Sequence, residues 1–80
     1  MTHSILRLPA VKASTGLSRS TLYLRIAQGV FPRPVSLGAR AVGWPDNEVA
    51  ALNAARIAGK SESEVRELVV RLGTARKTAA

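Results

Sequence analysis

The segment over residues 15–29, TGLSRSTLYLRIAQG, constrains the fold of this chain more than any other stretch. Gly16 favours a tight turn, because glycine adopts positive φ without a steric cost. Ser18 suits the position before a helix, since its hydroxyl can accept a hydrogen bond from an amide in the first turn. Gly29 suits the left-handed residue that commonly follows a helix. The segment therefore predicts a sharp turn and then a short helix with signals at both ends.

The predicted helix has two chemically different faces. Leu22 and Ile26 lie one turn apart and share an apolar face that we expect to be buried, and Leu17 can pack beneath them from the turn. The other face carries hydroxyls, a phenol and guanidinium groups, from Arg19, Ser20, Thr21, Tyr23 and Arg25. Such side chains are typical of a helix that contacts DNA. An ordinary amphipathic helix with a solvated polar side has the same pattern, so this segment alone leaves both interpretations open.

The segments on either side extend this helix into a larger motif. Residues 9–14 predict a preceding helix with a proline in its first turn, which makes a helix-turn-helix with the segment above. Residues 30–34 cannot be helical, because each proline there favours extended backbone before it. Two short apolar segments, at residues 35–37 and 41–44, lie on either side of a turn that contains a glycine. This pattern predicts a two-stranded β-hairpin with Arg40 near its tip. A hairpin in this place is typical of a wing, whose basic tip can lie on the DNA backbone.

A third helix is expected after the hairpin, over residues 45–58. Proline and acidic residues at its start favour a helix N-terminus, and the alanine-rich sequence propagates the helix. Val49, Leu52 and Ile57 give it a broad apolar side. Trp44 is the large residue expected to pack against this side, so the sequence predicts a core between the hairpin and the third helix.

A fourth helix is predicted by the capping-box sequence SESE at residues 61–64, with Gly73 as its expected end. Its apolar residues recur at i, i+3, i+4 and i+7, and they are Val65, Leu68, Val69 and Leu72. This face must bury against the domain or against another copy of the chain, so self-association through residues 62–72 stays open. We expect residues 1–4 and 74–80 to be flexible, which leaves a single domain over residues 5–73.

The charges are divided along the chain. The net charge is +7, and no acidic residue precedes Asp46, although arginine and lysine occur throughout. The first half is therefore uniformly basic, while the second half mixes both signs. Such a division suits a domain that binds a polyanion through one basic surface and uses its other charged residues to stabilise its own fold. The charge pattern thus favours double-stranded DNA as a partner.

The composition disfavours several other classes of function. The chain has no cysteine and a single histidine, His3, so we expect no metal site, and no cofactor motif is present. No pair of carboxylates suits a catalytic cleft, and we expect neither an enzyme nor a small-molecule substrate. No leader-like or membrane-spanning apolar run is present, which favours a cytoplasmic protein without a membrane partner. RNA is the weaker nucleic-acid candidate, because Tyr23 is the only aromatic side chain expected to stack on bases.

A set of short motifs over residues 5–57 is specific in combination. The motifs are Leu8-Pro9, Thr15-Gly16-Leu17-Ser18, Ser20-Thr21-Leu22-Tyr23, Ile26, Gly29, Phe31-Pro32, Pro34-Val35, Leu37-Gly38, Gly43-Trp44 and Glu48-Val49. In this arrangement the chain resembles the AlpA family of small phage and prophage regulators. The resemblance implies a winged helix-turn-helix protein, similar to phage excisionases and to the DNA-binding domains of MerR-type regulators. It also implies that residues 18–25 form the recognition helix and residues 33–44 the wing.

Together, the residues and the resemblance predict a mainly α winged helix-turn-helix domain with four helices and a two-stranded wing. Its expected function is sequence-specific binding of double-stranded DNA in the transcriptional regulation of a phage or mobile element, in control of integrase expression or in excision. The candidate DNA-binding residues are Ser18, Arg19, Ser20, Thr21, Tyr23, Arg25, Arg33 and Arg40. The alternative is a small protein-interaction module that docks through its C-terminal amphipathic helix. A steep salt dependence of nucleic-acid binding distinguishes the two.

Overall fold

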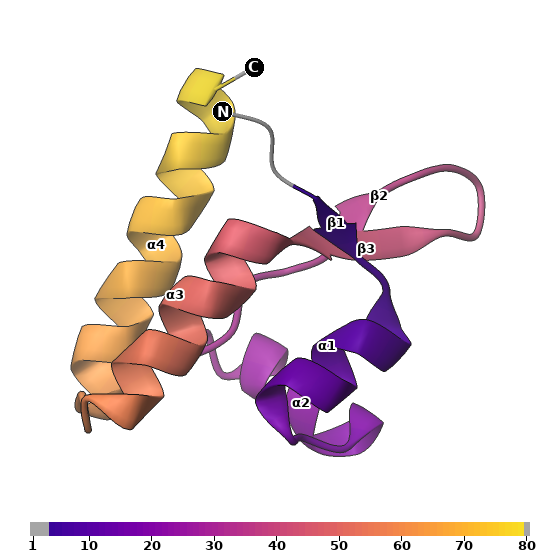
Figure 1. Cartoon of the computed structure of the whole chain (residues 1–80). Coiled ribbons are helices and arrows are strands. Elements are labelled where there is room, and N and C mark those ends of the chain that lie inside the picture. The colour runs from indigo at the N-terminus through magenta and orange to yellow at the C-terminus, as the bar shows by residue number, and fades with distance from the viewer. Residues whose placement is uncertain (1–3, 80) are drawn as a thin grey trace.

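The computed structural model describes residues 4–79, with side chains described for residues 4–77. Its elements, in order, are β1 (Ile5–Leu6), α1 (Leu8–Thr15), α2 (Arg19–Ala27), β2 (Val35–Ser36), β3 (Val42–Pro45), α3 (Asp46–Ile57) and α4 (Glu62–Ala79). Figure 1 shows the strands gathered at one side of the molecule, with the β2–β3 hairpin extending away from the helices and α4 running alongside α3. The expected mainly helical fold, with four helices and a hairpin between the second and third, is confirmed. Within the described residues, no helix has the length and hydropathy needed to cross a bilayer.

The turn between α1 and α2 forms as the sequence predicts. Gly16 has a φ of 73°, and its amide donates a hydrogen bond of 2.8 Å to the carbonyl of Lys12. The Ser18 hydroxyl accepts a 3.3 Å hydrogen bond from the amide of Thr21, which satisfies one of the free amides at the start of α2.

The end of α2 is also fixed by backbone hydrogen bonds. Gly29 has a φ of 78° and donates to the carbonyl of Ile26 at 3.1 Å, while Val30 donates to the carbonyl of Arg25 at 3.0 Å. This pair of bonds is the Schellman pattern, which closes a helix and turns the chain away. As a result α2 is a short helix held at both ends, and the chain leaves it toward the hairpin.

The predicted β2–β3 hairpin is present, but the sheet has a third strand, β1, that the prediction did not include. The order is β1-β3-β2 with antiparallel pairing; Leu6 lies opposite Trp44, and Val35 lies opposite Gly43. The amide of Asp46 also donates to the carbonyl of Ser4 at 2.8 Å, which continues the pairing beyond β1. A two-stranded hairpin is marginally stable by itself, and β1 supplies the third strand. Residues 1–3, which belong to the terminus expected to be flexible, and residue 80 lie outside the described range.

Gly43 is needed where the strands meet. A Cβ atom at this position would lie 3.0 Å from the carbonyl oxygen of Leu6 and 3.1 Å from Cδ1 of Leu37, and it would also overlap Cγ2 of Ile5. Only glycine leaves room for the apolar side chains that cross the sheet here.

The core is built around Trp44. Its fully buried members come from α1, α2, α3, the loop before β2 and β3, and they are Val11, Leu22, Phe31, Trp44, Val49 and Leu52. The indole nitrogen of Trp44 donates a 2.9 Å hydrogen bond to the carbonyl of Pro32, so its one polar atom is satisfied inside the core. The predicted burial of Leu22 and Trp44 is therefore confirmed. Ile57, expected on the apolar side of α3, is 88% exposed and does not belong to the core.

Helix α4 begins at the predicted capping box but continues beyond its predicted end. The Ser61 hydroxyl accepts from the amide of Glu64 at 3.3 Å, and a Glu64 carboxylate oxygen accepts from the amide of Ser61 at 3.1 Å. Gly73 lies inside the helix, so the expected stop at this glycine and the expected flexible tail are wrong for residues 74–79. Glycine costs a helix interior about 1 kcal/mol relative to alanine, and the tertiary contacts of Arg76 offset that cost.

Those tertiary contacts connect α4 to a buried carboxylate. The side chain of Glu48 is 4% exposed, and Arg76 donates to its two oxygens at 2.7 Å and 2.5 Å. Arg76 donates a further hydrogen bond of 2.8 Å to the carbonyl of Arg33. The last turns of α4 are thus bound to α3 and to the loop before β2. The apolar side chains of α4 at residues 65, 68, 69 and 72 pack against the core of the same chain.

Candidate nucleic-acid interface

Helix α2 presents its polar face outward because its apolar face is buried. Leu22 is fully buried, and Ile26 packs against the core one turn later. Arg19, Ser20 and Leu24 are exposed on the remaining surface, and Leu24 retains 56% of its accessible area. The outward face therefore combines a cation, a hydroxyl and an apolar side chain.

Three side chains form a stack that runs from α2 to β3. The guanidinium carbon of Arg19 lies 5.4 Å from the centroid of the Tyr23 ring, within the range of a cation–π contact. The Tyr23 ring in turn meets Trp44 edge to face, with 6.4 Å between centroids. Trp44 is fully buried, so Tyr23 has a fixed support and Arg19 rests on Tyr23. This stack directs Arg19 along the surface near the N-terminus of α2.

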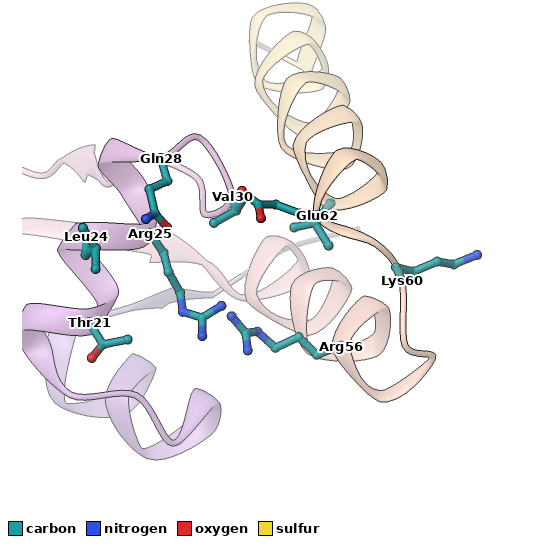
Figure 2. A pocket seen from close by; sticks show the side chains of 9 residues that line it. Thr21, Leu24, Arg25, Gln28, Val30, Arg56, Lys60 and Glu62 are labelled. Carbon is teal, nitrogen blue, oxygen red and sulfur yellow. The ribbon is translucent and has the colours of Figure 1, made fainter.

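The other flank of α2 lines a cavity. Thr21 and Arg25, one turn apart, face this cavity together with Arg56 of α3, and Lys60 of the α3–α4 loop lies at its edge with its side chain directed outward. Figure 2 shows the cavity between α2, the end of α3 and the start of α4. The predicted site residues on α2 are therefore divided between two flanks of the helix, with Arg19 and Tyr23 on one and Thr21 and Arg25 on the other.

The remaining predicted residues have distinct local roles. Ser18 is occupied in capping, since its hydroxyl donates to the Thr21 hydroxyl at 3.0 Å as well as accepting from the Thr21 amide. Arg33 has an exposed side chain, and its carbonyl oxygen accepts from Arg76. Arg40 is exposed in the turn between β2 and β3, where the amide of Leu37 donates to the carbonyl of Ala41 at 2.7 Å. Among the described residues, no hydrogen bond or ion pair joins the Arg40 side chain to α2.

The ion pairs of the described residues lie in the second half of the chain. They join Arg76 to Glu48, Arg66 to Glu62 and Lys60 to Glu64, with N–O distances of 2.5, 2.6 and 3.8 Å. Hydrogen bonds from the backbone and hydroxyl of Ser61, with Lys60 nearby, lower the pKa of the Glu64 carboxyl. Within residues 4–77, none of the arginines predicted to contact DNA forms an ion pair. Their charges therefore remain available to a partner. In the same part of the chain, no group of three metal-ligating side chains is present.

The sequence-based prediction missed Arg56. This residue lies on α3, away from the helix-turn-helix, yet its side chain reaches the cavity beside Arg25. A sequence signal was present, because no acidic residue lies three or four positions from Arg56, and Lys60 follows one turn later with the same charge. An unbalanced cation of this kind within the half of the chain that contains the acidic residues is a candidate for binding an anion.

Comparisons with known proteins place these features in a family. The chain is 53% identical over 55 residues to the uncharacterized protein ORF88 of enterobacteria phage P4, a match that covers 69% of this chain and 62% of the phage protein. It is 39% identical over 51 residues to the DNA-binding transcriptional activator AlpA of Escherichia coli K12, a match that covers 56% of this chain and 73% of that protein. The chain thus spans less than two thirds of the phage protein. No solved structure matches it significantly. The model of the prophage CP4-57 regulatory protein (AlpA) family matches residues 4–57, and the chain belongs to this family.

Proposed function

We propose that this chain is a winged helix-turn-helix protein that binds double-stranded DNA in a sequence-specific manner and regulates transcription. Helix α2 enters the major groove, and the β2–β3 hairpin is the wing beside it. One observation carries the proposal: the exposed face of α2 and the hairpin turn carry arginines that form no ion pair with any described residue, and the sequence contains no acidic residue before Asp46. The relative from E. coli is named a DNA-binding transcriptional activator, which supports the same function.

The geometry of α1 and α2 supports the placement of α2 in the groove. In helix-turn-helix proteins, residues near the N-terminus of the second helix contact base edges, while the rest of the motif orients it on the backbone. Arg19, Ser20 and Tyr23 occupy the first turns of α2, and Arg19 is held on the Tyr23 ring. These three residues contact the bases and nearby phosphates in our proposal, with the α2 N-terminus favouring phosphate at the same place.

The hairpin and the loop before it supply backbone contacts. Arg40 lies in an exposed turn, and Arg33 is exposed in the loop that leads to β2. A long side chain on such a turn reaches a phosphate without reading the base beside it. Ser18, Thr21 and Arg25 complete the proposed interface from the edge of α2. The protein acts in the cytoplasm, without a cofactor, on genes of a phage or other mobile element, in integrase expression or excision.

We do not extend the proposal to docking or self-association through residues 62–72. The apolar side chains that suggested such a surface pack against the core of the same chain. The alternative of a protein-interaction module that uses this helix therefore has less support than DNA binding. Enzymatic activity is not part of the proposal either, because the family is described as a regulatory protein and the E. coli relative as a transcriptional activator.

The test is to map and measure the DNA site directly. Footprinting with the full chain on DNA that flanks its own gene would identify the site, and binding isotherms would then compare the site duplex with a shuffled duplex at several salt concentrations. We expect tighter binding to the site and a steep loss of affinity as salt rises, since each phosphate contact releases counterions. Equal binding to both duplexes would contradict sequence-specific regulation, and no binding at low salt would contradict the function as a whole.

A further inference from the structure

The cavity beside α2 has a volume of about 460 Å³ and is lined by three elements that are distant in sequence. Its polar lining includes Thr21 and Arg25 from α2, Gln28 directly after that helix, and Arg56 from the last turn of α3. In Figure 2 the side chains of Arg25 and Arg56 extend from opposite sides, and their guanidinium groups point toward one another. Two cations are therefore directed into one space.

The acidic residue nearest to this space does not neutralise these cations. Glu62 lines the cavity, but its carboxylate is paired with Arg66 at 2.6 Å. The Nε of Arg66 also donates to the carbonyl of Gln28 at 3.1 Å, which holds that pair at the C-terminal end of α2. Lys60 is paired with Glu64 on the outer side. Within the described residues, Arg25 and Arg56 have no ion pair.

Arg25 is also incompletely satisfied as a hydrogen-bond donor. Its Nε atom is buried and has no hydrogen-bond partner in the structure. A buried donor without an acceptor is unfavourable, because it has lost its bonds to water and gained none. Like charges that face one another are unfavourable as well, and more so where water is partly excluded. An anion between Arg25 and Arg56 would relieve both costs at once.

We propose that this cavity binds a phosphate oxyanion between Arg25 and Arg56. A phosphate group has several oxygens, so it accepts forked hydrogen bonds from one guanidinium while still facing a second. A carboxylate has only two oxygens, and a forked pair of hydrogen bonds to one guanidinium uses both of them. The Thr21 hydroxyl, which already accepts from Ser18, retains its own proton to donate, and the Gln28 amide provides further donors. A small rotation of the Arg25 side chain brings its Nε–H to the oxyanion.

This phosphate has two sources with the same chemistry. One is the DNA backbone, since the cavity is also lined by Leu24, which is exposed on the outward face of α2. The other is a small phosphorylated molecule bound apart from DNA. The DNA source rests on the proposed function, whereas binding of a free phosphate does not. The two are therefore separated by one experiment without DNA and one with DNA.

The experiment without DNA follows the side-chain Nε–H resonances of Arg25 and Arg56 by NMR while inorganic phosphate is added at constant ionic strength, with chloride as the balancing anion. We expect saturable shifts of both resonances. The Arg56→Gln variant should bind phosphate about tenfold more weakly or worse, as expected for the loss of a charged hydrogen bond. Arg71→Gln is the matched control, because Arg71 lies on α4 outside this cavity, and it should bind phosphate as the wild type does. Acetate shifts as large as those with phosphate would overturn the assignment of the ligand class.

The experiment with DNA measures the salt dependence of duplex binding for the wild type, Arg56→Gln and Arg71→Gln. A salt slope lower by about one unit in Arg56→Gln alone, with unchanged preference between duplexes, identifies the ligand as a backbone phosphate. Saturable phosphate binding with an unchanged slope identifies a small phosphorylated ligand. The proposal is overturned if phosphate leaves both arginine resonances unshifted and the slope of Arg56→Gln equals that of the wild type. If the wild type fails to bind DNA, the proposed function fails while the phosphate titration still decides this inference.

Discussion

The two halves of the chain contain similar numbers of cations but use them differently. After Trp44, the basic side chains of Lys60, Arg66 and Arg76 pair with carboxylates. The pair between Arg76 and Glu48 joins the end of α4 to the buried side of α3. Before Trp44, no side-chain carboxylate is present in the sequence, and the arginines of α2 and the hairpin form no ion pairs within residues 4–77. The comparison teaches that charge in this protein stabilises the fold in the second half and remains open to a partner in the first.

Arg56 refines this comparison, because it is one of the basic residues after Trp44 that form no ion pair among the described residues. It belongs to α3 in the second half, and its side chain reaches the cavity beside α2. Whether a basic side chain stabilises the fold or remains open to a partner therefore depends on where it lies on the folded molecule. Position along the chain is only an approximate guide to it.

The largest expected effect comes from breaking the buried ion pair. Arg76→Gln leaves the carboxylate of Glu48, 4% exposed, without its cation, and we expect a loss of about 3 kcal/mol in the free energy of unfolding. Chemical denaturation of the purified variant measures this loss. The salt slope of DNA binding, measured at a temperature where the variant is folded, should remain that of the wild type.

The control for this prediction is an exposed ion pair in the same half. Glu62 and Arg66 have side chains that are 64% and 49% exposed, so Glu62→Gln should cost only about 0.2–1 kcal/mol. Equal losses in Arg76→Gln and Glu62→Gln would contradict a structural role specific to the buried pair. Truncation after Gly73 should destabilise at least as much as Arg76→Gln, because it removes Arg76 and the last turns of α4 together.

The next largest effect is expected at Arg19, in the unpaired half. A guanidinium that contacts guanine with two hydrogen bonds contributes about 1–3 kcal/mol of discrimination at one base pair. The contact between Arg19 and the Tyr23 ring fixes the direction of this side chain, as base recognition requires. Arg19→Ala should therefore reduce the preference for one position of the site, as measured by isotherms on single-base variants of the duplex. A uniform loss of affinity on every duplex would assign Arg19 to the backbone instead.

A smaller effect, of a different kind, is expected at Arg40. This side chain is exposed in the hairpin turn, without a partner among the described residues to fix its direction. Its contact should be with a phosphate, so Arg40→Ala should lower the salt slope by about one unit and weaken site and shuffled duplexes alike. Binding isotherms at several salt concentrations measure both quantities. A change in base preference with an unchanged slope would show that Arg40 reads sequence.

Local signals in the sequence were enough to predict most of the helices and the hairpin. Gly16, Ser18 and Gly29 fix the ends of α1 and α2 through backbone geometry and short-range hydrogen bonds, which a single segment reveals. The capping box at residues 61–64 marks the start of α4 in the same way. Each of these features depends on neighbours within a few positions.

The features that were missed depend on contacts between distant segments. Leu6 pairs with Trp44, and Arg76 binds Glu48, so neither the third strand nor the end of α4 has a local signal that identifies its partner. Gly73 even signalled a helix stop, which the ion pair of Arg76 overrode. The cavity between Arg25 and Arg56 likewise exists only after α2 and α3 have packed. Available charge could be predicted from the sequence, but its exact neighbours could not.

The smallest expected effect concerns pH and the capping box of α4. Hydrogen bonds from the backbone and hydroxyl of Ser61, with the charge of Lys60, lower the pKa of Glu64 below its usual 4.5. Since the folded-state pKa lies below the unfolded one, the ionised carboxylate stabilises the fold above pH 4.5, and this contribution disappears as the pH falls through the lowered pKa. The melting temperature of Glu64→Gln should therefore lie below that of the wild type near neutral pH. In acid the two melting temperatures should be equal. Thermal melts across this range measure the difference, which should shrink in a Ser61→Ala background. A difference that grows on acidification would show that Glu64 is not stabilised as a carboxylate.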